Sequence, residues 1–282
     1  MATGLSLHIG LNKVDPKKYG GWDGELVACE NDAHDMARIA RAAGFSDTTL
    51  LTADGTVENV TGELRKAAER LTRGDILLFS YSGHGGQVPN RVGPDSEPDD
   101  MDETLVLFDR EFLDDELYRE FARFADGVRI LAFLDSCHSG SAIEVRDLLN
   151  PEAMREQFQT DDPDEIENKA RLMPVDRQRE IYERDKDFFQ RLQRELADGG
   201  DHARANAVLI SACQDNQLAS DGPVNGKFTG TLIEVWGDGA FQGPYRAFHR
   251  DILRRMPPTQ SPNLHLAGQP QEEFLEQRPF TV

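Results

Sequence analysis

The chain has 282 residues, a formal net charge of −20 and an isoelectric point near 4.7. Hydrophobic residues make up 38% of it and charged residues 29%, which excludes a disordered chain and allows one large folded domain or two small ones. A chain this acidic repels phosphate backbones, so we exclude nucleic acid as a partner and expect cations or basic peptides instead.

The cysteines and the hydropathy indicate a cellular compartment. Cys29, Cys137 and Cys213 are too few, and odd in number, for a disulfide framework, which indicates a reducing environment. No apolar run approaches membrane-spanning length, and the N-terminus lacks a basic region followed by a long apolar one. We therefore expect a cytoplasmic protein with no membrane partner.

The first half of the chain alternates strand-like and helix-like segments. Short apolar runs predict strands, and apolar residues at helical spacing predict helices. The run at 76–81 is apolar throughout, which is typical of a strand buried on both faces. Loops are predicted at 11–24 and at the acidic, proline-containing segment 88–103. The predicted strands are 5–9, 48–52, 76–81, 104–108 and 128–134, and the predicted helices are 29–43, 57–71 and 114–124.

The composition changes after the last of these strands. Residues 147–200 contain fifteen acids and nine bases with few strand formers, which predicts an inserted, largely exposed helical linker. Within it, one helix face could be lined by Ile181, Phe188, Leu192 and Leu196. An apolar strand resumes at 207–212, followed by helices at 228–236 and 244–256 and a possible edge strand at 263–267. Strands alternating with helices predict an α/β layer on a parallel sheet.

Two reactive side chains follow two of the buried strands. His84 stands between Gly83 and the pair Gly85–Gly86, just past one strand, and Cys137 stands just past another. The carboxyl ends of parallel strands share one edge of a sheet, so the imidazole and the thiol can meet there. An imidazole in reach of a thiol can act as its base or hold a thiolate. The pair therefore favours nucleophilic catalysis over a structural cysteine and a turn histidine.

Other chemistries fit these residues less well. The segment from Gly83 breaks the dinucleotide-binding pattern at Val88, where a glycine would be needed. Cys137 and His138 are adjacent and point apart, and no paired cysteine spacing suggests zinc. A serine nucleophile lacks its usual glycine-flanked turn. Cys29 and Cys213 are interpreted as buried structural residues.

Several motifs together resemble the metacaspases, a branch of the caspase-like cysteine peptidases. The two motifs that carry the resemblance are S-G-H-G at 82–85 and D-S-C-H-S-G at 135–140, with the His-to-Cys interval known for caspases. Further similar segments are C-E-N-D-A at 29–33, D-D-E-L at 114–117 and S-A-C-Q-D-N-Q at 211–217. The resemblance covers residues 5–141 and resumes at 207–236.

The resemblance implies a fold and a domain organisation. It implies a three-layer α/β/α sandwich with a mostly parallel sheet of about six strands. Residues 1–146 would form the large, p20-like catalytic part, residues 147–205 an acidic helical insertion, and residues 206–282 a small, p10-like part that completes the same sheet. Metacaspases are generally monomeric, which implies a monomer here.

The resemblance also implies a mechanism and a specificity. Cys137 would attack the scissile carbonyl, His84 would act as general base and acid, and the backbone N–H groups of Gly85 and Cys137 would form the oxyanion hole. Metacaspases cleave after arginine or lysine, and carboxylates in a partly buried pocket favour such side chains. The positions that match the specificity pocket are Asp32, Ser82 and Asp135, with Asp215 as a possible addition. Asp32 also fits a helix N-cap.

Calcium and self-processing are further implications. Many metacaspases need calcium, and the matching acids here are Asp99, Asp114, Asp115 and Glu144, the oxygen ligands that calcium prefers. Metacaspases are often cut by themselves after a basic residue in the linker. The candidates, left unranked, are Arg146, Lys169, Arg171, Arg177 and Arg179. Two alternatives remain open: a catalytically silent caspase-like module that binds partners, and a caspase-like peptidase with another residue preference.

Overall fold

The structure is a computed structural model. It describes residues 2–90, 101–137, 151–197, 206–214, 217–267 and 272–282.

A six-stranded sheet forms the centre of the molecule, with the strand order β2-β1-β3-β7-β8-β9. All neighbouring pairs are parallel except β8 and β9, which are antiparallel. The predicted mostly parallel sheet of about six strands is therefore confirmed. The strands are β1 (Gly4–Gly10), β2 (Ser46–Leu51), β3 (Ile76–Ser82), β7 (Arg129–Asp135), β8 (Asn206–Ser211) and β9 (Asn263–Ala267).

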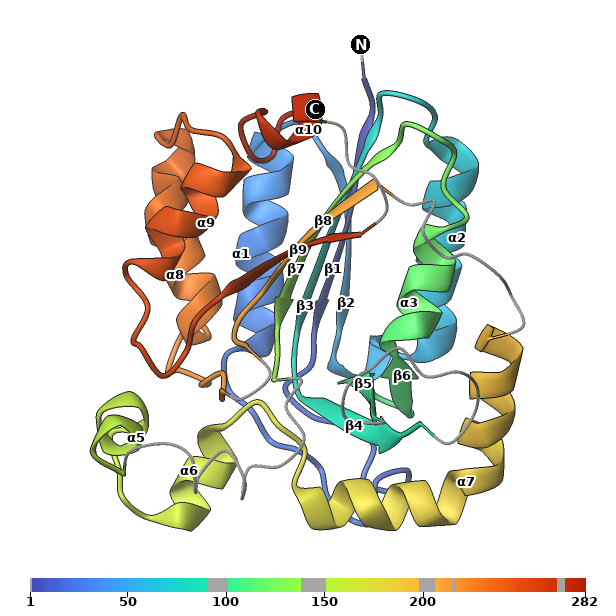
Figure 1. Cartoon of the computed structure of the whole chain (residues 1–282), viewed down its shortest axis with the longest axis vertical. Coiled ribbons are helices and arrows are strands. Elements are labelled where there is room, and N and C mark those ends of the chain that lie inside the picture. Colours follow the sequence, from blue (N-terminus) through green and yellow to red (C-terminus); the bar gives the residue numbers. More distant parts are fainter. Residues whose placement is uncertain (1, 91–100, 138–150, 198–205, 215–216, 268–271) are drawn as a thin grey trace.

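Helices cover both faces of this sheet (Figure 1). Helices α1 (Cys29–Ala42), α8 (Lys227–Trp236) and α9 (Tyr245–Leu253) cover one face. Helices α2 (Val57–Arg70) and α3 (Asp114–Phe121) cover the other. Successive side chains of β3 explain the two layers, because Leu78 packs in the first core and Leu77 and Phe79 pack in the second.

A second, three-stranded antiparallel sheet lies beside the carboxyl ends of the central strands. Its strands are β4 (Gly85–Pro89), β5 (Met101–Val106) and β6 (Glu111–Leu113). The predicted loop at 88–103 is therefore wrong at both ends, and the strand predicted at 104–108 belongs to this small sheet. The glycine pair that opens β4 concealed it, because glycine has low strand propensity. The first residue of β4, Gly85, immediately follows His84.

The acidic insertion forms α5 (Pro151–Phe158), α6 (Pro163–Lys169) and α7 (Val175–Ala197). All three lie where the parallel strands end, and α7 runs along the small sheet (Figure 1). Three of the four residues expected on one face of α7, Ile181, Leu192 and Leu196, are buried in one cluster with Val88 and Val106 of that sheet. The fourth, Phe188, is only partly buried against this cluster. The predicted linker therefore has one buried apolar face, and many of its other described residues are exposed.

Short elements complete the chain: the 3-10 turns Thr52–Asp54 and Gly237–Gly239, and α10 (Glu272–Leu275). None of the helices in the described ranges has the length and apolar character needed to cross a membrane.

Candidate active site

His84 and Cys137 occupy equivalent places after neighbouring strands. Strands β3 and β7 pair in register, with Ser82 opposite Asp135, and each reactive residue follows two positions later. Both side chains are buried, with 4% of His84 and none of Cys137 exposed. The sheet therefore brings the two predicted residues to one edge, as the sequence pattern requires.

A loop after β1 holds the imidazole of His84. The Nε2 atom lies 3.1 Å from the carbonyl oxygen of Gly24, so Nε2 carries the proton and Nδ1 is left as the acceptor. The ring of Trp22 packs edge-on against it at 4.8 Å. Gly24 has φ +57°, and a Cβ there would meet both rings, so glycine is required. Within the part of the chain that the structure describes, Nδ1 has no hydrogen-bond partner, and burial lowers the pKa of His84 to about 4.

The thiol of Cys137 is turned toward the loop that follows β8. The N–H of Ala219 donates a hydrogen bond to its Sγ at 2.9 Å, and the Ala219 carbonyl lies 3.6 Å away. The Cys213 thiol also contacts it, and this contact together with burial raises the pKa of Cys213. Among the described residues, no hydrogen bond joins the Cys137 thiol to the His84 ring. The thiol is therefore oriented toward Ala219.

An extended segment of the insertion lies across the two residues. The N–H groups of Gly85 and Cys137 both donate to the carbonyl oxygen of Arg171, each at 3.0 Å. On one side of this carbonyl, the Arg171 N–H donates a hydrogen bond to the carbonyl oxygen of Ala219. On the other side, the Met173 N–H donates to the Gly85 carbonyl at 2.8 Å. The segment thus forms backbone hydrogen bonds with the site, in the way that a bound extended peptide adds a strand to a sheet.

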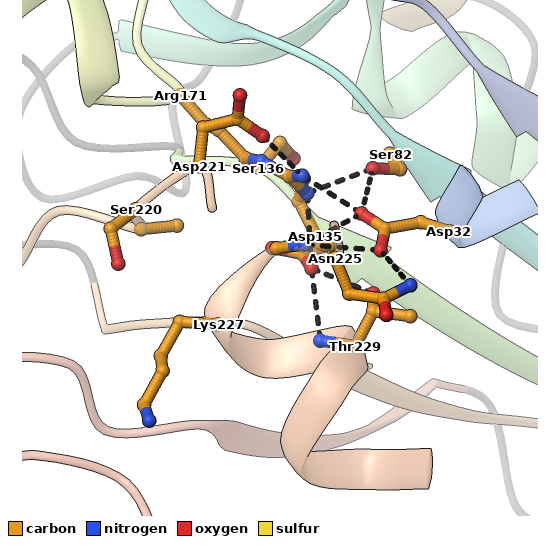
Figure 2. A network of polar contacts seen from close by, with 12 residues as sticks. Asp32, Ser82, Asp135, Ser136, Arg171, Ser220, Asp221, Asn225, Lys227 and Thr229 are labelled. Atoms are coloured by element: carbon orange, nitrogen blue, oxygen red, sulfur yellow. Dashed lines mark hydrogen bonds and ion pairs between the residues drawn. The ribbon is translucent and has the colours of Figure 1, made fainter. Parts of the chain in front are cut away.

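The guanidinium of Arg171 is completely buried among three carboxylates (Figure 2). Its Nη2 lies 2.8 Å from Asp32 and 2.9 Å from Asp221, and its Nη1 lies 3.0 Å from Asp135. Nη1 also donates to the Ser82 hydroxyl at 2.8 Å. Burial acts to lower the pKa of Arg171, but the three carboxylates outweigh it and raise that pKa. For Asp32, burial raises the pKa to about 6, and the nearby Arg171 guanidinium opposes this rise.

The start of α8 and the preceding loop complete the walls of this acidic pocket (Figure 2). The N–H and hydroxyl of Thr229 both donate to Asp135 Oδ2, at 3.0 and 2.6 Å. The Asn225 amide and the Gly226 N–H donate to Asp32. A Cβ at Gly226 would lie 2.5 Å from the guanidinium, so only glycine leaves room for it. The carboxylates are therefore held in place by hydrogen bonds as well as by the arginine.

Other predicted residues fall elsewhere. Asp99, Glu144, Arg146 and Asp215 lie outside the described residues. Asp114 and Asp115 open α3 and are half-exposed. Among the basic candidates of the linker, Lys169 and the two arginines of α7, Arg177 and Arg179, are on the surface and pair with neighbouring acids.

Sequence reasoning missed three groups that hold the pocket: Asp221, Asn225 and Thr229. Nothing distinguishes Asp221 from the other acids of the chain, so no sequence signal marked it. Arg171 did carry a signal that went unused. It is flanked by Ala170, Leu172 and Met173, whereas each of the other basic candidates has a charged or amide residue directly beside it. An apolar setting is typical of a segment that packs into a site.

Comparisons with known proteins agree with this geometry. The family profile described as the caspase domain (Peptidase C14) matches residues 9–279. The curated relatives include Metacaspase-1 of Mycosarcoma maydis, 28% identical over 80% of this chain and 59% of that protein. They also include Metacaspase-8 of Arabidopsis thaliana, 31% identical over 53% of this chain and 41% of that protein. The chain therefore spans less than two thirds of the length of these relatives.

Solved structures show the same fold. A protein of Geobacter sulfurreducens is 47% identical, covers 99% of both chains and has a TM-score of 0.85. Caspase-1 of Spodoptera frugiperda is 12% identical, covers 96% of this chain and 92% of its own, and has a TM-score of 0.55, which supports the fold alone. With the profile matching almost the whole chain, and metacaspases among its relatives, the protein belongs to the caspase domain family.

Proposed function

We propose that the protein is a cysteine endopeptidase that cleaves peptide bonds after arginine or lysine through Cys137 and His84. One observation carries the proposal. The Arg171 peptide unit lies with its side chain among three carboxylates and its carbonyl on two N–H groups beside the cysteine. That is the arrangement expected for the residue before a scissile bond.

The geometry supports a specific sequence of steps. The Cys137 thiol turns from Ala219 toward His84, whose unpartnered Nδ1 accepts its proton. The thiolate attacks the carbonyl carbon, and the N–H groups of Gly85 and Cys137 stabilise the oxyanion. His84 then protonates the leaving amine, and water hydrolyses the thioester with the same histidine as base. Gly24 keeps the imidazole in the required tautomer throughout.

The acidic pocket supports a basic residue before the scissile bond. Three buried carboxylates repel an aspartate side chain and attract a guanidinium or an ammonium group. The planar guanidinium contacts all three at once, which favours arginine over lysine.

Peptide hydrolysis tests this specificity. We expect peptides with arginine before the scissile bond to be cut fastest, lysine peptides more slowly and aspartate peptides not at all. In Asp135→Asn the kcat/KM for the arginine peptide should fall about a hundredfold, because one partner of a buried charge pair is lost. Asp47→Asn, which removes a surface carboxylate paired with Arg41, is the matched control and should retain activity. Cleavage of the aspartate peptide at a comparable rate would contradict the proposal.

The same contacts support self-cleavage between Arg171 and Leu172. Of the basic linker residues that the structure describes, Arg171 has its carbonyl on the Gly85 and Cys137 N–H groups, and the others lie on the surface. The orientation of the Cys137 thiol toward Ala219 is consistent with a bond that stays intact until the site is activated.

Calcium is proposed as the activating ion. Asp114 and Asp115 place two adjacent carboxylates at the start of α3, and their oxygens suit a hard cation. Within the described ranges no three metal-binding side chains come together, and the other two predicted ligands, Asp99 and Glu144, lie outside those ranges. All four acids would hold the ion, whose charge would offset their mutual repulsion and order the segments that carry them.

Removal of calcium should therefore slow both reactions. We expect a calcium chelator to reduce arginine-peptide hydrolysis and linker cleavage at least about tenfold, and excess Ca²⁺, unlike Mg²⁺, to restore them, because a flexible carboxylate site suits the larger ion. The double variant Asp114→Asn, Asp115→Asn should show the low rate with or without calcium. Rates that the chelator leaves unchanged would remove the metal from the proposal.

A further inference from the structure

Met173, the second residue after the Arg171–Leu172 bond, is fixed in the site by its backbone. Its N–H donates to the Gly85 carbonyl at 2.8 Å, and its carbonyl accepts a hydrogen bond from the Gln178 side chain of α7 at 2.5 Å. The Met173 side chain is completely buried. A substrate that replaced this segment would place its own second residue at the same point, because the Gly85 backbone belongs to the site.

The side chain of Met173 lies on the face of the small sheet that α7 covers. A Cβ added to Gly86 of β4 would lie 3.2 Å from Met173 Cε, 3.1 Å from the Thr104 hydroxyl and 3.0 Å from Glu111 Oε1. The methionine and the glutamate therefore reach the same small space, which the missing side chain of Gly86 keeps open. Gly86, Thr104 and Glu111 come from the three neighbouring strands β4, β5 and β6.

Glu111 is a buried acid beside the apolar cluster that contains Met173. Its side chain is fully buried, Oε1 accepts a hydrogen bond from the Thr104 hydroxyl at 3.1 Å, and Oε2 has no hydrogen-bond partner among the described residues. Burial raises the pKa of Glu111 to about 8. The charged side chains nearest on α7, Arg184 and Asp185, pair with each other. A buried carboxyl oxygen without a partner is costly, and the methionine cannot supply a donor.

We propose that Glu111 is the floor of a subsite for the second residue after the scissile bond, and that it selects substrates with lysine or arginine there. The proposal rests on the proposed peptidase function and adds a second basic position to its substrates. A lysine at this position reaches one atom further than methionine, so its ammonium group can meet the free oxygen. The ion pair formed would be shielded from water, where charge-assisted hydrogen bonds are strong.

Three internally quenched peptides test the subsite. They share arginine and leucine around the scissile bond and differ only at the next residue, which is methionine, lysine or glutamine. We expect kcat/KM for the lysine peptide to exceed that for the methionine peptide about tenfold, and Glu111→Gln to bring the ratio to about one. Glu25→Gln, a neutralised surface acid of the cleft beside His84, is the matched control and should keep the tenfold ratio.

The outcomes separate this inference from the proposed function. A fluorogenic substrate that ends in arginine and carries no residue after the scissile bond reports on peptidase activity alone, and Glu111→Gln should cut it normally. A lysine-to-methionine ratio near one in the natural protein, or one that Glu111→Gln leaves unchanged, would overturn the subsite. Equal cleavage of the glutamine and lysine peptides would overturn its basic preference.

A stability measurement gives a readout without catalysis. In the Cys137→Ala chain the linker segment stays in the site, so Met173→Lys places an ammonium group on Glu111. We compare Met173→Lys in two backgrounds, one with Glu111 and one with Glu111→Gln. The fall in Tm should be several degrees smaller in the background that keeps Glu111. An equal loss of Tm in the two backgrounds would overturn the contact between position 173 and Glu111.

Discussion

Replacing Cys137 by alanine is expected to lower arginine-peptide hydrolysis by about 10⁴-fold or more and to leave the linker uncut, because no other side chain can form the thioester. The fold should survive, since the thiol's partners among the described residues are the Ala219 backbone and the Cys213 thiol, and losing one such hydrogen bond costs about 1 kcal/mol. Fluorogenic peptide assays measure the first effect, and gel electrophoresis of purified protein measures the second.

Cys213→Ala is the matched control for this experiment. Cys213 is also a buried thiol, it touches Cys137, and its Sγ lies 3.7 Å from the Ser136 carbonyl. Its removal should lower stability slightly and leave at least about a third of the hydrolysis rate, because its thiol contacts Cys137 but takes no part in the proposed attack or proton transfers. Equal hydrolysis by the natural protein and Cys137→Ala would favour the catalytically silent interaction module instead.

Replacing Arg171 by alanine is expected to abolish linker cleavage entirely. Alanine leaves the acidic pocket empty, so the bond before Leu172 is no longer held on the two N–H groups. Mass spectrometry of the natural protein should find a fragment that begins at Leu172, and Arg171→Ala should remain one chain. Arg171→Lys should restore cleavage at a lower rate. Fragments ending at Lys169 or Arg177 would show that another basic residue is used.

The same substitution should also destabilise the uncut protein. In the Cys137→Ala background, Arg171→Ala leaves Asp32, Asp135 and Asp221 without their cation and should cost about 3–5 kcal/mol of unfolding free energy. Lys169→Ala is the control, because its ammonium group is half-exposed and its pair with Glu165 is worth little. Denaturant unfolding measures the stability of both variants. Equal unfolding midpoints for Arg171→Ala and Lys169→Ala would mean that the Arg171 side chain does not stabilise the pocket.

The order of the central strands and helices could be predicted from the sequence because their apolar residues keep one period over a whole element. The run at 76–81 and the helix of α2 are examples, and both end within one residue of the prediction. Strand β4 was missed because Gly85 and Gly86 carry no side chain that could reveal a strand. What selects glycine there is the close approach of the Cys137 carbonyl, which a Cβ at Gly85 would overlap.

The candidate site was predictable where a residue type is scarce and chemically distinctive. His84 and Cys137 stand out after buried strands, and Asp135 stands beside them. Asp221 is one acid among many, and it joins the pocket only because a loop after β8 folds back to Arg171. That long-range contact joins positions 50 residues apart, so it left no local pattern to read.

The backbone pairing of the inserted segment would hold the new chain end in the site after a cut behind Arg171. Residues 151–171 would remain joined to Cys137 through residues 138–150, and the Lys169 carbonyl would still accept its bond from Asp221. The new end would therefore be an intramolecular product competing with every substrate at an effective concentration in the millimolar range. Cutting the chain and vacating the pocket are then separate events, and the apparent KM would depend on how readily this tethered arginine leaves.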